Sequence, residues 1–473
     1  MHRKTIGAVI APFVRTNTHL GTAADNLRGT RGETMNPQTF ATLVRGSILH
    51  FLADPGEGDD ASAWQYFEDG ALLIEHGKVV RAGPWRDIIT ALPTLTKQTA
   101  RTFDYSGKLI VPGLVDTHVH YPQVQVMGSF GRQLLDWLEH YTFPAEAAFS
   151  NRSLAEKASA FFLDRLLAHG TTTASVFATV HPHSVDAFFE AAQSRNLRML
   201  CGKVMMDRHC PENLRDTPES ALNDSRKLIE RWHGKGRLRY SVTPRFAPTS
   251  TPEQLHVAGE LFNGYPDMHL QSHLSENRRE IEWVGELFPG HSNYVDVYDH
   301  YKLLGRGAIY GHGIHLDAGE RTRLAETGTA IAFCPSSNLF LGSGFFHYDA
   351  AHAVGVPVGL ATDVGGGTSL SMLRTMAAAY TVGQAQHKPL SAWRAWYLAT
   401  LGGAQALGLD DFIGNFKAGK EADFAVFDFK ATPELEWRVD HAKSIEEKLF
   451  ALITLGDERC VSATHILGDK VTA

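Results

Sequence analysis

Apolar and polar positions follow two different patterns along the chain, and the change falls near residue 106. From Gln38 to Tyr105 the apolar runs are short and are separated by turn residues, which is typical of β-strands. One strand is predicted over Phe40–Leu52. A hairpin is predicted over Ala71–Ala82, with Glu75-His76-Gly77-Lys78 at its turn. The first part of the chain therefore predicts a small β-rich unit.

From Lys108 onward, apolar strands alternate with helix-length segments. The predicted strands are Leu109–Val115, Thr171–Val180, Arg198–Asp207, Leu238–Phe246, Met268–His273, Gly307–His312, Thr329–Cys334 and Val356–Asp363. The helix-length segments are Ser153–Ala168, Ser184–Arg195, Pro218–Trp232, Pro252–Phe262, Arg278–Leu287 and Ala318–Glu326, and a longer helical run covers Ser369–Gln386. Such repeated strand–helix units over about 300 residues are typical of a (β/α)8 barrel.

The tail, from Ile413, returns to strands at Phe424–Phe429 and Ala463–Lys470. The barrel is therefore inserted between two β-rich halves, which must pack together to bury their apolar faces. We predict an α/β fold. It consists of a (β/α)8 TIM barrel over residues 106–410 and a smaller β-sandwich domain built from residues 35–105 and 411–473. Residues 1–34 are interpreted as a flexible N-terminal extension, with Met35 as a candidate natural start.

Composition excludes several classes of protein. Hydrophobic residues make up 43% and charged residues 21%, too apolar for a disordered chain. The net charge of −7 argues against a nucleic-acid partner. The longest uncharged run, Thr327–Tyr348, is broken by Pro335 and glycines, so no membrane-spanning segment is predicted. The four cysteines are scattered without a C-x-x-C pair, which argues against a disulfide framework and fits a reducing cytoplasm.

Histidine is over-represented, with 24 residues, and the position of each one decides what it means. Barrel active sites lie at the C-terminal ends of the strands. Four predicted strand ends carry Asp116-Thr117-His118-Val119-His120, His273-Leu274-Ser275-Glu276, Gly311-His312-Gly313 and Thr362-Asp363. Residues two apart on a strand point the same way, so His118 and His120 can share one ion. The similar His181-Pro182-His183 has no acidic neighbour and is interpreted as a helix-entry loop, although a place near the site stays open.

Two segments resemble the amidohydrolase superfamily of metal-dependent hydrolases. These are Val111–His120 and the C-terminal Gly419-Lys420-Glu421-Ala422-Asp423, and the likeness runs from about Phe40 to the end of the chain. The resemblance implies one divalent metal ion, most simply Zn²⁺, held by His118, His120, His273 and Asp363. Members with two metals use a modified lysine at the end of strand 4. Here that strand ends in Thr243-Pro244-Arg245-Phe246, so a single ion is favoured.

Three imidazoles and a carboxylate leave a position for water, whose pKa a Zn²⁺-like ion lowers from about 15.7 to about 7. Glu276 is expected to act as the proton shuttle. Its alternative role is that of a first-turn acid in the helix that begins near Asn277. His312 is expected to hydrogen-bond the attacking oxygen, unless it is a packed loop histidine. Asp363 is expected to accept a proton as well as to bind the metal, and Fe or Mn stay open as the ion.

Within the superfamily, the resemblance is closest to the guanine deaminase family. The segments that carry it are Tyr121-Pro122-Gln123, Leu134–Glu146, Thr243–Phe246, His273–Asn277, Cys334–Asn338 and Thr362-Asp363-Val364. It implies guanine contacts from Gln123, Arg245 and Phe246. Arginine can donate to the O6/N7 edge of guanine, and glutamine offers both a donor and an acceptor. The alternative for Phe246 is a phenylalanine packed in the core, and the alternative for Arg245 is a surface ion pair. Trp137 is expected to pack in a lid over the barrel.

The resemblance implies hydrolytic deamination of guanine to xanthine and ammonia in purine catabolism, by a homodimer. The cysteines, the negative charge and the lack of a long apolar run add the expectation of a cytoplasmic protein without a nucleic-acid or membrane partner. One alternative is an amidohydrolase acting on another aminated heterocycle, such as 8-oxoguanine, a thiomethyl-adenosine or a triazine. Those enzymes should differ at Arg245 and Gln123. Another alternative is an inactive scaffold, which should have lost metal ligands, whereas this chain keeps the full set.

Overall fold

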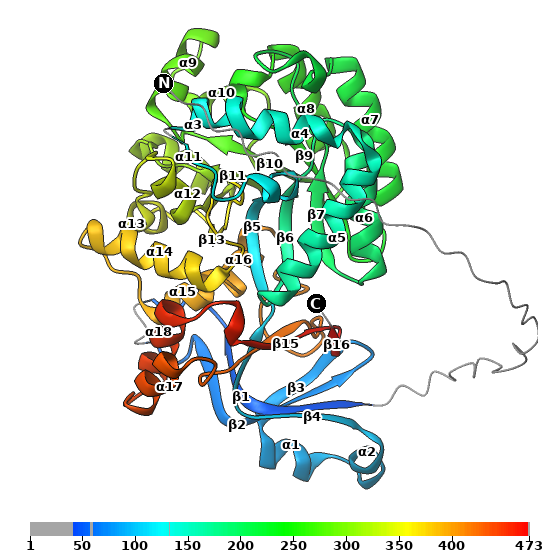
Figure 1. Ribbon diagram of the computed structural model, residues 1–473, viewed down its shortest axis with the longest axis vertical. Coiled ribbons are helices and arrows are strands. Elements are labelled where there is room, and N and C mark those ends of the chain that lie inside the picture. Colours follow the sequence, from blue (N-terminus) through cyan, green and yellow to red (C-terminus); the bar gives the residue numbers. More distant parts are fainter. Residues whose placement is uncertain (1–40, 57–59, 132, 472–473) are drawn as a thin grey trace, which may run out of the picture. The chain divides into compact units, whose positions relative to one another are not determined.

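The computed structural model describes residues 41–56, 60–131 and 133–471, which form two β-sheets with helices around them (Figure 1). The extension expected over residues 1–34 and the candidate start at Met35 lie outside the described residues.

The larger sheet is the predicted (β/α)8 barrel. In the described part of the chain it holds β5 (Leu114–His120), β6 (Thr171–Phe177), β7 (Arg198–Gly202), β8 (Val204–Met205), β9 (Arg239–Pro244), β10 (His269–Leu274), β11 (Ala308–His312), β12 (Ala330–Phe333) and β13 (Val358–Leu360). The strands pair in parallel, and β7 and β8 share one barrel position because both pair with β9. Nearly every strand residue is buried, as expected for parallel strands covered by helices.

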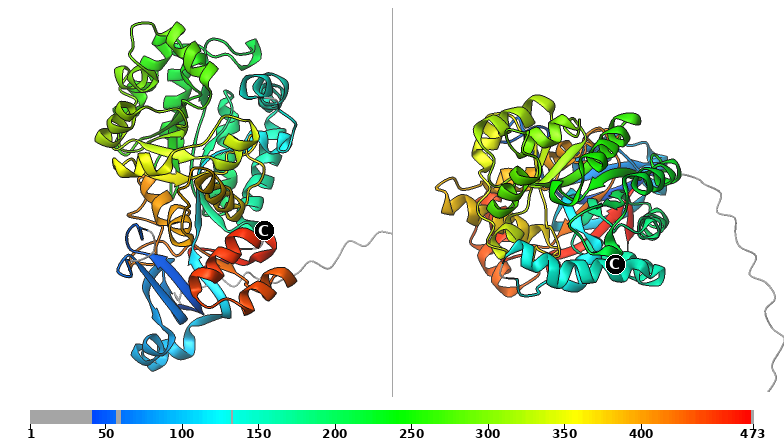
Figure 2. Two further views of the ribbon diagram at one scale, coloured as in Figure 1. Left: turned by 90° about the vertical axis from the view of Figure 1, so that its left-hand side faces the viewer. Right: turned by 90° about the horizontal axis from the view of Figure 1, so that it is seen from above.

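Helices surround these strands, as the view from above shows (Figure 2). The main covering helices are α5 (Arg152–Ala168), α6 (Pro182–Ser194), α7 (Pro218–Trp232), α8 (Pro252–Gly264), α9 (Arg278–Leu287), α11 (Ala318–Thr327) and α14 (Met372–Ala385). Their boundaries lie within three residues of the predicted ones, because capping residues mark the starts. Thr217 caps α7 and Asp317 caps α11. Among the described residues, no helix is long and apolar enough to cross a lipid bilayer.

Further helices lie around the barrel and against the smaller sheet. They are α1 (Trp85–Ala91), α2 (Thr94–Thr99), α3 (Leu134–Trp137), α4 (Phe143–Ala147), α10 (Tyr294–His300), α12 (Pro335–Phe340), α13 (Tyr348–Ala353), α15 (Ala392–Leu398), α16 (Leu401–Ala406), α17 (Pro433–Asp440) and α18 (Ile445–Leu455). The first turn after β5 is the 3₁₀-helix η1 (Tyr121–Val126), which leads toward α3 and α4.

The smaller sheet joins the two ends of the described chain, as predicted. Its strands run in the order β16-β15-β14-β4-β1-β2-β3, with bounds β1 (Thr42–Phe51), β2 (Trp64–Glu75), β3 (Lys78–Pro84), β4 (Arg101–Pro112), β14 (Phe424–Phe427), β15 (Val461–Ile466) and β16 (Asp469–Val471). The two halves meet where β14 pairs antiparallel with β4. Apolar residues of both halves, among them Ile48, Ile110 and Phe424, share one buried core.

The strand expected over Leu109–Val115 is divided between the two sheets. Leu109–Pro112 ends β4 in the small sheet, and the barrel strand β5 begins at Leu114 and runs through His120. Gly113 lies at the junction, where a Cβ atom would meet Thr172 Oγ1 at 2.0 Å. One apolar run therefore serves two sheets, and the close approach at Gly113 fixes where it passes between them.

A buried ion-pair cluster fastens the C-terminal tail to the barrel. Glu421 Oε2 accepts a hydrogen bond from Arg198 Nε (2.7 Å), and Glu421 Oε1 accepts one from Arg198 Nη2 (2.6 Å). Arg237 also donates to Glu421, at 2.9 Å, and pairs with Asp423. The Gly419–Asp423 segment thus supplies the acids that meet arginines at the start of β7 and just before β9.

We expect Arg198→Met to lower the free energy of unfolding by about 3–5 kcal/mol, because it removes the bidentate partner of a buried carboxylate. Denaturant titration followed by circular dichroism measures the change. The matched control is Arg306→Met, since Arg306 is 76% exposed and lies 3.9 Å from Asp410; it should change stability by less than about 0.5 kcal/mol. Equal effects of the two substitutions would contradict the anchoring role of Arg198.

Candidate active site

The barrel closes between its first strand and the segment that follows its last strand. Asp363 N donates to His118 O (2.9 Å), and His120 N donates to Val364 O (2.8 Å). Beneath them, Asp116 accepts hydrogen bonds from Thr362 N (3.0 Å) and Thr362 Oγ1 (2.5 Å). Burial raises the pKa of Asp116 to about 6, although the bonds from Thr362 act in the opposite direction. Asp116 therefore holds the two strand ends together.

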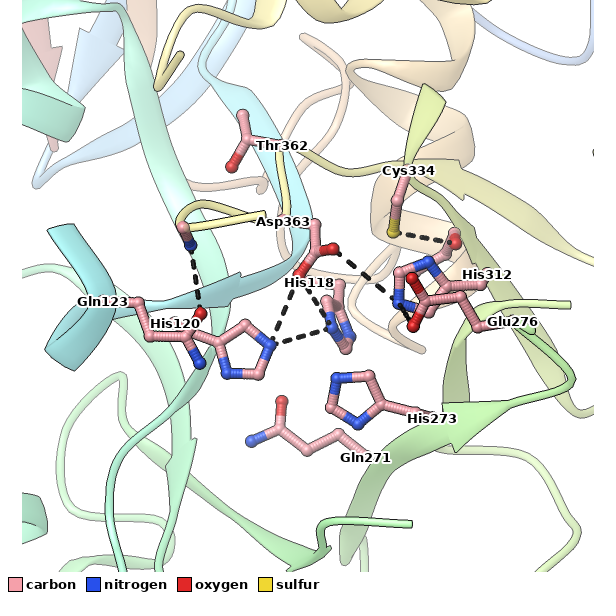
Figure 3. Close-up of polar contacts among 12 residues, drawn as sticks. His118, His120, Gln123, Gln271, His273, Glu276, His312, Cys334, Thr362 and Asp363 are labelled. Atoms are coloured by element: carbon pink, nitrogen blue, oxygen red, sulfur yellow. Dashed lines mark hydrogen bonds and ion pairs between the residues drawn. The ribbon is translucent and has the colours of Figure 1, made fainter. Parts of the chain in front are cut away.

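This closure brings the side chains of the predicted metal ligands close together (Figure 3). His118 Nε2 and His120 Nε2 are 3.2 Å apart, and Asp363 Oδ1 lies 3.4 Å and 3.3 Å from them. His118, His273, His312 and Asp363 each offer one ligand atom, and these four atoms lie within 4.8 Å of one another. This group contains His312 and not the expected His120, which lies beside it with its Nε2 3.2 Å from His118 Nε2 and 3.3 Å from Asp363 Oδ1.

The electrostatics of this group suit a divalent cation. Burial lowers the pKa of His120 to about 3, and burial also lowers the pKa values of His118 and His273. Burial acts to raise the pKa of Asp363, but hydrogen bonds from His118 and His120 outweigh it and hold that pKa well below its usual range. Neutral imidazoles around an ionised carboxylate are the donor set that Zn²⁺-like ions take. The residues therefore fit a divalent metal ion.

Hydrogen bonds from outside the cluster orient the imidazoles of His273 and His312. His273 Nδ1 donates to the backbone oxygen of Arg245 at 2.6 Å. His312 Nδ1 lies 2.8 Å from Asn338 Oδ1, and because this oxygen can only accept, Nδ1 carries the hydrogen. The Nε2 atoms of both rings are left to face the cluster, a common way of presenting a ligating histidine.

Glu276 lies beside His312, with Oε2 3.3 Å from His312 Nε2, and Oε1 accepts from Ser343 Oγ at 3.1 Å. Burial, with the charge of Asp363, raises the pKa of Glu276 to about 8. The alternative role as a helix-capping acid belongs to its neighbours. Asn277 caps α9, and Glu280 accepts from the backbone N–H groups of Glu276 and Asn277. The carboxylate of Glu276 therefore faces the cluster.

Close packing and unusual backbone shape the strand ends. His312 and Asp363 adopt left-handed backbone conformations, with φ of 74° and 48°. Such values are uncommon for residues other than glycine and concentrate at functional sites. Gly311 leaves room for the ring of His118, because a Cβ atom there would lie 2.7 Å from His118 Cε1.

A pocket opens over the cluster. It is lined by His120, Gln123, Leu134, Trp137, Leu138, Arg245, Phe246, His273, Glu276, Glu280, His312, Leu341, Asp363 and Gly366. The three residues expected to contact the substrate, Gln123, Arg245 and Phe246, are thus next to the candidate metal ligands. Trp137 packs in the apolar part of this wall, as a lid aromatic would. Arg245 is buried and pairs with a carboxylate, so it does not form a surface ion pair.

The second H-x-H pair stands apart from this pocket. His183 Nε2 lies 2.8 Å from Phe149 O, and His181 directly precedes α6. Neither residue is among those that line the pocket. Pro182 and His183 form the first turn of α6 and only His181 precedes it, so the segment begins the helix and is not the loop that was expected.

Three residues that contact the predicted site residues were not themselves predicted from the sequence: Glu146, Asn338 and Ser343. Glu146 accepts from Gln123 and Arg245, and Asn338 and Ser343 contact His312 and Glu276. Glu146 and Asn338 are the last residues of two segments that resemble guanine deaminases, and this resemblance was the only sequence signal that could have pointed to them. Their partners lie 23 to 99 residues away, so no local pattern reveals the contacts.

Comparisons with known proteins agree with this geometry. The amidohydrolase family model matches residues 109–471. Guanine deaminase of Escherichia coli (strain K12) is 51% identical over 438 residues, which cover 92% of this chain and 99% of that protein. The solved structure of E. coli guanine deaminase has a TM-score of 0.88 and covers 91% of this chain and 99% of that one. The guanine deaminase from C. acetobutylicum with bound guanine in the active site is 28% identical, with a TM-score of 0.82, covering 91% and 100%.

We expect Gly311→Ala to weaken the binding of a divalent ion by about 10–100-fold, because the added methyl group displaces the His118 ring that a precise site requires. Equilibrium dialysis with metal analysis of the refolded, washed protein measures the affinity. Gly285→Ala is the matched control, since nothing lies within 4 Å of a Cβ atom there. Unchanged metal affinity in the folded Gly311→Ala protein would show that the close approach to His118 has no role in metal binding.

Proposed function

The chain belongs to the amidohydrolase family, and we propose on that premise that its barrel hydrolyses guanine to xanthine and ammonia. Guanine deamination is supported by the 51% identity with E. coli guanine deaminase over nearly the whole of both chains. The observation that carries the proposal is the single pocket in which Arg245 and Gln123 lie beside a cluster of histidines and an aspartate. The residues proposed to bind the base and those proposed to react with it thus line the same pocket, as a deaminase requires.

The ion we propose is Zn²⁺, bound by His118, His120, His273 and Asp363. The Nε2 atoms of His118 and His120 converge on the same oxygen of Asp363, which supports this set. When bound, such an ion lowers the pKa of a coordinated water toward neutrality and supplies a nucleophile. His312 also belongs to the group of four residues that could hold an ion, and we assign it outside this set because its Nε2 lies closer to Glu276 Oε2 (3.3 Å) than to Asp363 Oδ2 (3.7 Å).

Glu276 is the proposed proton carrier. The oxygen of the water would bond to C2 of guanine while Glu276 takes one proton from that water and delivers it to a ring nitrogen. The second proton would pass from the new C2–OH group to the exocyclic amine, so that the bond from C2 to this amine breaks and ammonia leaves as the C2 carbonyl forms. A carboxylate whose pKa lies near the working pH can both accept and return a proton, and burial raises the pKa of Glu276 to about 8. Ser343, at 3.1 Å, orients its other oxygen.

His312 and Asp363 are proposed to assist. His312, oriented by Asn338, would hydrogen-bond the attacking oxygen, and Asp363 would accept a proton from the same water. On the substrate side, Arg245 would donate to the O6/N7 edge, Gln123 would bind the ring amide edge, and Phe246 would cover a face of the base. The pocket is lined by five of these residues: His312, Asp363, Arg245, Gln123 and Phe246.

We further propose a cytoplasmic homodimer that acts in purine catabolism, with the free base and not nucleic acid as substrate. The four cysteines are free, which suits a reducing compartment. The net charge of −7 disfavours a polyanionic partner.

An ammonia-release assay with a panel of aminated heterocycles tests the proposed reaction. We expect turnover of guanine with xanthine as product, and loss of that activity after chelation with recovery on adding back Zn²⁺, because the metal supplies the nucleophile. The panel includes 8-oxoguanine, a thiomethyl-adenosine and a triazine. No turnover of guanine alongside turnover of another member would contradict guanine as the substrate.

We expect Glu276→Gln to lower kcat by about 10²–10⁴-fold with the metal content unchanged, because the amide keeps the shape but cannot carry the proton. Steady-state kinetics and elemental analysis measure both quantities. Glu282→Gln, an exposed position on the same α9 helix, is the control and should behave as wild type. Near-normal turnover by Glu276→Gln would remove Glu276 from the proton path.

A further inference from the structure

Glu146 is a buried carboxylate that the proposed reaction does not use, and it contacts two residues that line the pocket, Gln123 and Arg245. It lies in α4, 1% exposed. Arg245 Nη1 donates to both of its oxygens, at 3.0 Å and 2.8 Å, and Gln123 Nε2 donates to Oε1 at 2.9 Å. The two residues assigned to guanine recognition therefore meet on one carboxylate, although they follow different barrel strands.

The carboxylate fixes which way the amide of Gln123 faces. Gln123 Nε2 points to Glu146, and Gln123 Oε1 accepts from the backbone N–H of Gly365 at 3.3 Å. A flipped amide would place its oxygen against the carboxylate and its NH2 group against the N–H of Gly365, so the flipped form is disfavoured twice. One N–H and one lone pair of Gln123 then remain for a ligand.

Arg245 is held in the same manner. Its guanidinium is planar, so bonding through Nη1 fixes the directions of Nη2 and Nε. The ring of Phe143 lies 5.5 Å from its central carbon and limits tilting. Within the part of the chain that the structure describes, Arg245 Nη2 and Nε donate no hydrogen bond, although the residue is only 2% exposed. Because Arg245 lines the pocket, these N–H groups can meet an acceptor that a ligand brings.

Glu146 also balances the charge of Arg245. An isolated guanidinium in this wall would attract anions, whereas the ion pair leaves the recognition side without net charge. A neutral base with an acceptor for Arg245 and a donor–acceptor edge for Gln123 suits this arrangement, and guanine presents O6 and N1–H side by side.

We propose that Glu146 is a specificity-determining positioning residue, whose carboxylate orients Arg245 and Gln123 so that they read the 6-oxo edge of guanine. This inference rests on the proposed function. It assigns Glu146 no contact with the reacting atoms: the residue acts through Arg245 and Gln123.

The test compares Glu146→Gln and Glu146→Asp with wild type. In Glu146→Gln the new NH2 group faces Arg245 Nη1 at whichever oxygen it replaces, because Nη1 donates to both. We expect the KM for guanine to rise by about 10–100-fold, with kcat within about 3-fold of wild type and metal content unchanged. Glu146→Asp keeps the charge and should recover part of the lost KM.

Specificity for the 6-oxo group is measured with 2-aminopurine, which lacks that group and is used as an inhibitor of guanine turnover. Its inhibition constant should change by less than about 3-fold in Glu146→Gln, because Arg245 finds no O6 on it. Glu139→Gln, an exposed position on the same segment, is the control and should match wild type.

A KM for guanine within 2-fold of wild type in Glu146→Gln would overturn the inference. So would an equal loss for guanine and 2-aminopurine, or a fall in kcat accompanied by metal loss, because these indicate a merely structural role. A wild-type protein inert toward guanine would instead contradict the proposed function, so the two failures are distinguishable.

Discussion

The backbone bonds that join His118 and His120 to Asp363 and Val364 are the constraint on which the site depends. A barrel requires its first and last strands to meet, and here they meet at the end where the side chains converge. Asp116 reinforces the junction through Thr362. Because closure and ligand placement use the same residues, the ligands are brought together by the fold itself.

Arg245 connects the reactive and the recognition halves of the pocket. Its backbone oxygen accepts from His273 Nδ1 and so orients a proposed metal ligand, while its guanidinium meets Glu146 on the other side. A shift of this residue would disturb both halves at once. The arrangement explains how a strand end without a lysine or histidine still contributes to the chemistry.

Much of this could be predicted from the sequence, because the information is local. Strand–helix alternation gives the barrel, and histidines and acids at strand ends give the cluster around His118, Glu276 and Asp363. The division of Leu109–Val115 between two sheets could not be predicted, because a continuous apolar run does not indicate which sheet each of its residues joins. Glu146 was missed for a similar reason. Its partner Arg245 is 99 residues away, and only the folded barrel makes the pair.

We propose that closure of the barrel builds a site for one divalent ion beside the pocket that binds guanine. Anomalous X-ray scattering from crystals of the purified protein locates such an ion. We predict one peak, about 2.0–2.2 Å from His118, His120, His273 and Asp363, with His312 still paired to Asn338. A peak bound by His312 in place of His120, or a second ion in the pocket, would contradict it.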